Sequence, residues 1–315
     1  MAQFEQLIAA NKRNSVLLVV VFVLFICGLG GLLGWAIWGD PRAAVPSIAI
    51  ALTVAVVTGL VGYYSGPQAV LALSRARPIS KQDDPQLYNV VEELTLASGL
   101  PMPRLYVIDT PAMNAFATGR DPDHAHIAVT SGLRERLGRD QLQGVLAHEL
   151  SHVQNYDTRF MTLMAVLVGV VVLLADIGLR SLFWGGGRRR SRGSGGGGGI
   201  IMLVILLAAI VLAIIAPIFA KLIQLAVSRQ REYLADASGA LIVRNPYGLS
   251  SALKKLGAYQ GKLRTASAAT AHMFIANPFG KDRGTSANLF ASHPPLEDRI
   301  QRLEQLVLPT EPASR

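Results

Sequence analysis

Two histidines four residues apart, with a glutamate directly after the first, are the strongest chemical signal in the chain. They are His148, Glu149 and His152, within the stretch AHELSH. Positions four apart share one face of an α-helix, so both imidazoles can reach one metal ion. Zinc with two histidines and a third protein ligand keeps a position open for water, whose proton a nearby carboxylate can accept. The motif therefore predicts a zinc site with Glu149 as the general base of peptide hydrolysis.

The motif needs a helix, because on a strand the two histidines would point in unrelated directions. Asp140 is suited to be the N-cap of such a helix, with Gln143 three residues later. An apolar face follows, made of Leu142, Val145, Leu146 and Val153. Two surface histidines on an amphipathic helix are the alternative, which a third ligand would exclude.

A third ligand is available about 80 residues downstream. Glu232 and Asp236 lie one turn apart in a stretch with a helical pattern over residues 228–243. Glu232 can be the third ligand, and Asp236 can accept a hydrogen bond from the far nitrogen of a ligating histidine. A charged helix face paired with Arg229 or Arg231 is the alternative. The upstream motif favours the metal-site interpretation.

The composition is that of a membrane protein. Of the 315 residues, 51% are hydrophobic and only 16% are charged, and the mean hydropathy is +0.37. No charged residue occurs between Ser15 and Trp38 or between Ala43 and Tyr64. Each of these stretches is long enough to cross the ~30 Å hydrocarbon layer.

Charge and cysteine content exclude other classes of site. The net charge of +9 comes from basic residues that flank apolar segments rather than alternate with aromatic ones, which indicates contact with a lipid bilayer and no nucleic acid. The single cysteine, Cys27, excludes an intramolecular disulfide and a cysteine metal cluster.

The elements that would position these residues are those of an integral membrane protein. We predict a mainly α-helical fold with a small sheet and about four transmembrane helices. Short strands are predicted over residues 104–109 and 125–130, and helices over 85–98, 246–259 and 295–306. Residues 1–65 are predicted to form a membrane hairpin with helices at 15–38 and 43–64, and residues 66–158 the first part of the metalloprotease domain. Two membrane segments, at 160–184 and 200–223, are predicted within 159–227. The second part of the domain follows over 228–308, and then a disordered tail over 309–315. A Gly/Arg linker over 185–199 joins the two later segments.

The metal site constrains the membrane topology. His152 and Glu232 must meet at one ion, so the chain between them crosses the bilayer an even number of times, as two spans or as a hairpin that does not cross fully. Lysines and arginines near the first two helices place the catalytic side in the cytoplasm. These are Lys12, Arg13, Arg75, Arg77 and Lys81, with only Arg42 in between.

Several separated motifs resemble those of the HtpX family of membrane zinc metalloproteases, related to the Ste24-type prenyl-protein proteases. They are residues 114–119, His148 to His152 with Asn155 and Asp157, residues 228–237, and Ser292 to Pro295 with Arg299. The resemblance implies an α+β gluzincin-type domain holding one zinc ion per subunit. It also implies that His148, His152 and Glu232 are the ligands and that Glu149 is the general base.

The same motifs contain further candidate residues. Asn155 and Asp236 are expected to contact the metal ligands rather than the metal itself. Asn114, Ala115 and Phe116 could pair with an extended substrate by strand addition, or form a buried edge strand. His293 could stabilise the oxyanion as a catalytic group or bond a ligand, or be a loop histidine held by the two prolines that follow.

The predicted function is that of a membrane-embedded zinc endopeptidase in a bacterial inner membrane. By resemblance, its polypeptide substrates are misfolded membrane proteins, and its role is quality control under stress. A membrane scaffold or holdase with structural zinc is one alternative, although a structural site normally has four protein ligands. A Ste24-like processing protease is another.

Overall fold

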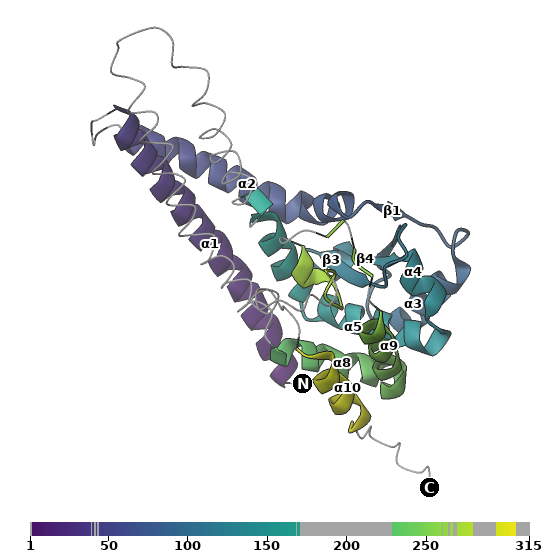
Figure 1. Ribbon diagram of the computed structural model, residues 1–315. Helices are drawn as coiled ribbons and strands as arrows, with labels where there is room; N and C mark the ends of the chain where they lie inside the picture. The colour runs from purple at the N-terminus through teal and green to yellow at the C-terminus, as the bar shows by residue number, and fades with distance from the viewer. Residues whose placement is uncertain are drawn as a thin grey trace.

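Two long apolar helices project from a mixed domain in a computed structural model of the chain (Figure 1). The structure describes residues 2–38, 40, 42, 44–167, 169–170, 229–259, 261–263, 265–266, 270–279 and 294–306. Helix α1 spans Ala2–Trp38 and α2 spans Ala44–Leu73. By length and composition, Ala9–Gly31 and Ala44–Leu73 could each cross a membrane. The predicted helices at 15–38 and 43–64 fall on these elements, and both extend further.

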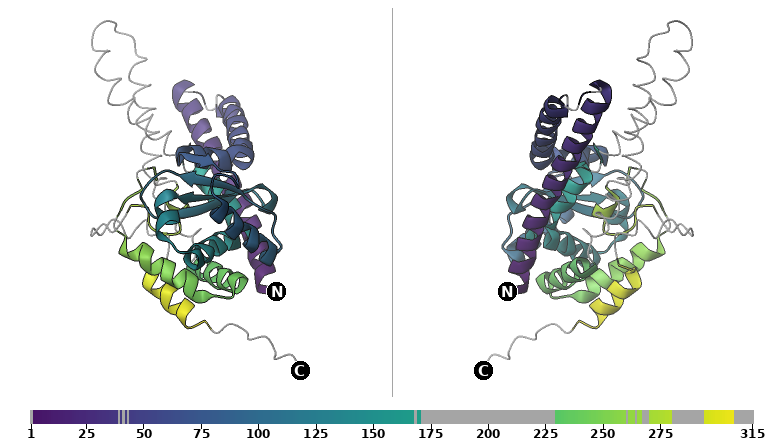
Figure 2. Two further views of the ribbon diagram at one scale, coloured as in Figure 1. Left: turned by 90° about the vertical axis from the view of Figure 1, so that its right-hand side faces the viewer. Right: turned by 90° about the vertical axis from the view of Figure 1, so that its left-hand side faces the viewer.

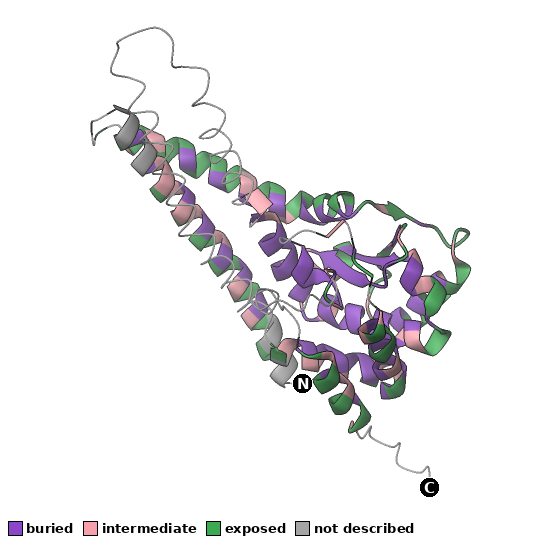
Figure 3. Ribbon diagram, in the orientation of Figure 1, coloured by how far each residue is buried: buried purple, intermediate pink, exposed green. Residues whose placement is uncertain are grey.

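Small residues allow α1 and α2 to lie close together near the loop that joins them. A Cβ at Gly30 would lie 2.4 Å from the Cβ of Ala51, so the two backbones meet there. The helices diverge toward the domain, and the helix over residues 157–167 lies between them (Figure 1). Its Phe160 and Met164 belong to the same buried cluster as Phe22 of α1. The outward faces of α1 and α2 stay exposed and apolar, as contact with lipid requires (Figure 3).

The later membrane segments fall mostly outside the described residues. Residues 157–167 and 169–170 are helical, which covers the start of the predicted segment at 160–184. The rest of that segment, the linker over 185–199, the segment at 200–223 and the tail over 309–315 lie outside the described part of the chain.

A four-stranded mixed sheet forms the centre of the domain, in the order β1-β2-β4-β3. The strands are β1 Ala76–Pro78, β2 Arg104–Ile108, β3 Ala115–Gly119 and β4 Ala125–Thr130. β2 and β4 pair in parallel, whereas β1 and β3 pair antiparallel with them at the two edges. The predicted strands at 104–109 and 125–130 coincide with β2 and β4. β3 is an edge strand, so its outer backbone groups remain available to other segments.

Helices cover both faces of this sheet. Besides α1 and α2, the helices of the domain include α3 Pro85–Ser98, α4 Ser131–Arg136, α5 Arg139–Gln154, α8 Arg229–Val243, α9 Pro246–Ala258 and α10 Leu296–Glu304. The main core joins alternate residues of the strands, such as Ile127 and Val129, to α3, α5 and α9. The opposite face packs on the end of α2 and on residues 161 and 165. Helices α8, α9 and α10 lie together at the end far from the α1–α2 loop (Figure 2).

The start of α5 differs from the prediction that Asp140 is its N-cap. The N-cap is Gly138, whose N–H donates to the side-chain oxygen of Gln141 at 3.1 Å. The prediction was wrong because the amide of Gln141 closes the first turn two residues earlier than a capping carboxylate at Asp140 would.

Two glycines bring α8 and α9 directly against α5. A Cβ at Gly239 of α8 would lie 2.9 Å from the backbone nitrogen of His148, and one at Gly144 of α5 would lie 2.5 Å from that of Leu249. Real Cβ atoms do not approach backbone this closely. The absent side chain at Gly239 therefore sets the distance from α8 to the face of α5 that carries His148 and His152.

We expect Gly239→Ala to push α8 away from α5 and to separate Glu232 from the two histidines. Overpacking of this kind costs about 1–3 kcal/mol. Thermal unfolding and metal analysis of the purified protein should both show the loss. Gly257→Ala is the matched control, since its Cβ would meet only the flexible Cδ1 of Leu296 at 3.3 Å. Wild-type metal affinity in Gly239→Ala would contradict this account of the helix contact.

Candidate metal centre

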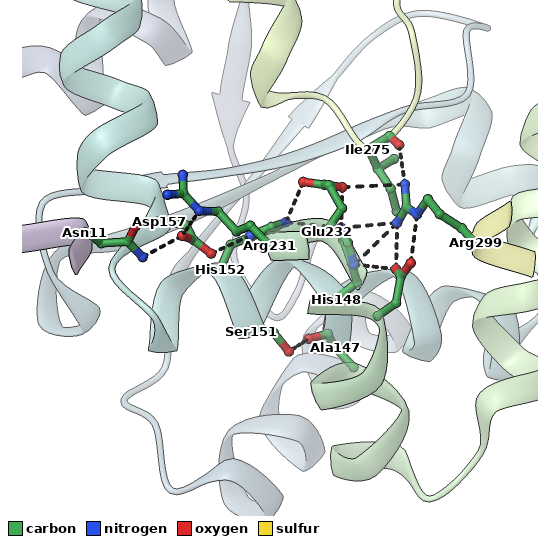
Figure 4. A network of polar contacts seen from close by, with 11 residues as sticks. Asn11, Ala147, His148, Ser151, His152, Asp157, Arg231, Glu232, Ile275 and Arg299 are labelled. Atoms are coloured by element: carbon green, nitrogen blue, oxygen red, sulfur yellow. Dashed lines mark hydrogen bonds and ion pairs between the residues drawn. The ribbon is translucent and has the colours of Figure 1, made fainter. Parts of the chain in front are cut away.

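The structure brings His148 and His152 of α5 together with Glu232 of α8 (Figure 4). The two Nε2 atoms lie 3.2 Å apart, and the Glu232 oxygens lie 3.7 Å from that of His148 and 3.5 Å from that of His152. Ligand atoms at tetrahedral positions about 2.0–2.1 Å from zinc are about 3.3 Å apart. All three side chains are at most 4% exposed. Their spacing fits one tetrahedral metal ion.

The outer nitrogens of the histidines determine which atoms face the centre. Nδ1 of His148 lies 2.9 Å from Oδ1 of Asp236, and Nδ1 of His152 lies 2.9 Å from Oδ2 of Asp157. Each Nδ1 donates its hydrogen to a carboxylate, so each Nε2 of a neutral ring presents a lone pair to the other. Two lone pairs and a carboxylate at this distance repel each other unless a cation lies between them. The donor set therefore fits a metal ion.

The surroundings shift the pKa values of the two histidines in opposite directions. Burial lowers the pKa of His148 to about 4, despite its hydrogen bond to Asp236. Burial would also lower the pKa of His152, but the hydrogen bond to Asp157 and the charge of Glu232 raise it to about 9. His152 is thus the position that holds a cation most strongly, whether a proton or a metal.

Arg299 of α10 holds the carboxylate behind His148. Its Nε and Nη2 donate to the two oxygens of Asp236 at 2.8 and 2.7 Å, and its Nη1 donates to the carbonyl of Ile275 at 3.2 Å. Burial would raise the pKa of Asp236, but the charge and hydrogen bonds of Arg299 outweigh it and lower the pKa. Arg299 is fully buried, so this bidentate pair fixes Asp236 in its ionised form.

Asp157 contacts the outer nitrogen of His152, as Asp236 contacts that of His148. Besides the bond from His152, it accepts a hydrogen bond from Asn11 of α1 at 2.7 Å and lies 2.9 Å from Nε of Arg231. Tyr156 has a φ of 60°, which turns the chain after α5 so that Asp157 faces back toward the helix. Helical spacing does not reveal this residue, because it lies beyond the helix end. Asn11 is 146 residues away and carried no signal in the sequence.

Glu149 lies beside the ligands and is 2% exposed. Burial raises its pKa to about 7, with Glu232 adding to the shift and His152 opposing it. The backbone of Ala117 in β3 also opposes the rise in this pKa. A carboxyl group with a pKa near neutrality is suited to accept and return a proton at physiological pH.

The residues predicted to bind substrate, Asn114, Ala115 and Phe116, are buried at the edge of the sheet. The carbonyl of Ala115 accepts a hydrogen bond from the N–H of Ile275 at 3.0 Å. The Asn114 side chain bonds both backbone groups of Ala276, and the ring of Phe116 meets that of Phe274 edge-on at 5.1 Å. The segment 274–276 therefore occupies this part of the β3 edge, and a peptide can pair here only if that segment moves aside.

Of the two remaining predicted residues, only Asn155 lies in the described part of the chain, and its side chain does not join the network. Asn155 is the C-cap of α5; its carbonyl accepts from Asn11 at 2.8 Å, and its Oδ1 has no hydrogen-bond partner among the described residues. His293 lies outside the described residues.

Comparison with known proteins identifies the family. The model of peptidase family M48 matches residues 81–307. The chain belongs to this family. A protease HtpX homologue of Caldanaerobacter subterraneus is 46% identical over 304 residues, covering 96% of this chain and 98% of the relative. One from Tropheryma whipplei is 45% identical over 299 residues, covering 95% and 97%.

A solved structure is also similar. The crystal structure of Ste24p from S. mikatae aligns with a TM-score of 0.49 at 20% identity, over 95% of this chain and 66% of that one. The predicted relationship to the HtpX family is confirmed by the curated relatives. With its two apolar helices, the protein is a membrane metalloprotease.

We expect Arg299→Met to leave Asp236 ionised and buried without its main partner. Breaking such a pair destabilises a protein by about 3–5 kcal/mol, and losing a residue behind a metal ligand lowers metal affinity about 10–100-fold. Chemical denaturation and competitive metal titration measure these two effects. Arg302→Met is the control, because Arg302 is exposed on the same helix and stacks on Tyr233. Equal metal affinity in the two variants would refute the role given to Arg299.

Proposed function

We propose that the protein is a zinc-dependent endopeptidase in which His148, His152 and Glu232 hold the ion. The observation that carries this proposal is the convergence of two Nε2 lone pairs and a carboxylate, with separations of 3.2–3.7 Å, in a buried site. Three protein ligands leave a fourth position for water or substrate, as in hydrolytic zinc sites. A structural zinc in a scaffold or holdase is less favoured, because the described residues offer no fourth protein ligand at this centre.

The residues around the ligands have different roles in hydrolysis. Zinc supplies Lewis-acid activation of water and of the scissile carbonyl. Glu149 accepts the proton of the attacking water and passes it to the leaving amine, for which a pKa of about 7 is suited. Asp236 and Asp157 keep the two imidazoles in the tautomer that leaves Nε2 unprotonated. His293, by its place in the chain's C-terminal motif, would donate a hydrogen bond to the oxyanion.

The substrate would bind as an extended strand along β3. The backbone of Ala117 influences the pKa of Glu149, so a peptide aligned with this edge would pass close to the general base. Asn114, Ala115 and Phe116 would extend this pairing after displacement of residues 274–276. We further propose that misfolded proteins of a bacterial inner membrane are the substrates, since the centre is bonded to a membrane helix through Asn11.

We also propose a multi-pass topology with the catalytic domain in the cytoplasm. Lysines and arginines gather at the end of α1 and α2 that joins the domain, whereas Arg42 lies at the other end. Two further crossings within 159–227 would return the chain to the same side, which the meeting of His152 and Glu232 requires.

Replacing the general base tests the mechanism. We expect Glu149→Gln to keep its metal, because Glu149 is not a ligand, and to lose about a hundredfold to ten-thousandfold in cleavage rate. Cleavage of a membrane-protein substrate and metal content are measured on the same preparation. Wild-type protein treated with a chelator is the comparison, and it should lose both. A Glu149→Gln variant that cleaves at the wild-type rate would refute this assignment.

Cysteine labelling tests the topology. In a Cys27→Ser background, which removes the single natural cysteine, Ser194→Cys is labelled from each side of sealed vesicles with a membrane-impermeant maleimide. The four-span topology predicts labelling only from the side opposite the catalytic domain. Lys81→Cys in the same background reports the catalytic side. Labelling of both positions from the same side would exclude the four-span topology.

A further inference from the structure

Three cations and three tyrosines form a continuous cluster where α1 and α2 enter the domain. Lys12 lies 4.4 Å from the ring centroid of Tyr156, and Arg159 lies 4.9 Å from the same ring and 5.7 Å from that of Tyr63. Tyr63 meets Tyr64 edge-on at 5.0 Å, and Arg120 lies 5.3 Å from the Tyr64 ring. Nε of Arg159 donates to the carbonyl of Arg120, which closes the cluster. We call these six residues the interfacial cluster.

The interfacial cluster lies at one level of the two membrane helices. Gly59 of α2 faces Val19 of α1, since a Cβ at Gly59 would lie 3.7 Å from Cγ1 of Val19. At 1.5 Å per residue, Tyr63 is about 6 Å and Lys12 about 10 Å from that contact, both toward the domain. The uncharged part of α1 begins at Ser15, just inside this level. Tyrosines and snorkelling cations at the end of an apolar span mark the head-group region of a bilayer.

The positive charge of the interfacial cluster is only partly compensated by the protein. Arg120 lies 3.5 Å from Asp121, which also bonds His124. The nearby carboxylate of Asp157 is buried and pairs with Arg231. Within the described residues, neither Lys12 nor Arg159 has a carboxylate at ion-pair distance, and the two Nη groups of Arg159 have no hydrogen-bond partner.

We propose that the interfacial cluster binds the phosphate of an anionic phospholipid. A lipid phosphate offers several acceptor oxygens to the Nη groups of Arg159 and to the ammonium of Lys12, and the tyrosine rings hold these cations in place. The head group of phosphatidylglycerol has a net negative charge, which the cations of the cluster attract. In phosphatidylcholine, the positive choline cancels the negative charge of the phosphate. Lys12 and Tyr64 are exposed, so a lipid head group at this level of the helices can reach the cluster from that side.

The site adjoins the metal centre without being part of it. Lys12 follows Asn11, and Tyr156 precedes Asp157, so two cluster residues are sequence neighbours of the groups that bond behind His152. The proposal concerns lipid binding and does not depend on the assignment of the general base.

Lipid retention tests the proposal. Full-length protein is equilibrated in mixed micelles with equal amounts of phosphatidylglycerol and phosphatidylcholine, repurified, and analysed for bound lipid. Each basic group at an anionic surface favours binding about fivefold, so wild type should retain phosphatidylglycerol at least fivefold over phosphatidylcholine. Lys12→Gln combined with Arg159→Gln should bring this ratio close to one. Arg42→Gln, which removes one positive charge at the opposite end of the helices and so matches Lys12→Gln alone, should keep the wild-type ratio.

Controls separate lipid binding from folding and from free phosphate. Lys12→Gln alone changes an exposed side chain, so if the double variant does not fold, a severalfold fall in the ratio for this single variant is the deciding result. Inorganic phosphate at millimolar concentration should not displace the lipid. Equal retention of both lipids by wild type, an unchanged ratio in the folded variants, or displacement by inorganic phosphate would each overturn the proposal.

Discussion

Burial of charge around two histidines is the constraint on which the rest of the structure depends. Four carboxylates lie buried there, those of Glu149, Asp157, Glu232 and Asp236. An ionised carboxylate without a partner costs several kcal/mol in such a place. Arg299 and Arg231 compensate two of them, and a divalent cation between the histidines would compensate the other two. A bound metal ion would thus stabilise this arrangement of helices in addition to its part in the reaction.

The same network ties the membrane helices to the metal centre. Asn11 of α1 bonds Asp157, which in turn bonds His152, and the helix over 157–167 begins at that carboxylate and packs between α1 and α2. A shift of α1 relative to the domain would therefore disturb the orientation of His152. Helix α1 thus contributes to the site indirectly, because its Asn11 holds the carboxylate that is hydrogen-bonded to His152.

The free edge of β3 is partly covered by another segment of the chain. Segment 274–276 is hydrogen-bonded to β3 in the manner of a short added strand, and the carbonyl of Ile275 also binds Arg299. Displacing it would expose Ala115 and would loosen Arg299 at the same time. Access to the β3 edge and the arrangement behind His148 are therefore linked through Ile275.

The sequence alone determined the elements and ligands that follow a local period. The two apolar stretches, the strands at 104–108 and 125–130, and the histidines at helical spacing could all be recognised, because a helix or strand repeats its own geometry. Asp157, Arg299 and Asn11 could not be assigned their contacts, since each reaches the centre from beyond a helix end or from a distant element. Only the tertiary structure decided those contacts, through the close approach of α8 to α5 at Gly239 and the turn at Tyr156. Hydrogen bonds between remote segments leave no period in a sequence, whereas the fold brings their donors and acceptors within 3 Å of one another.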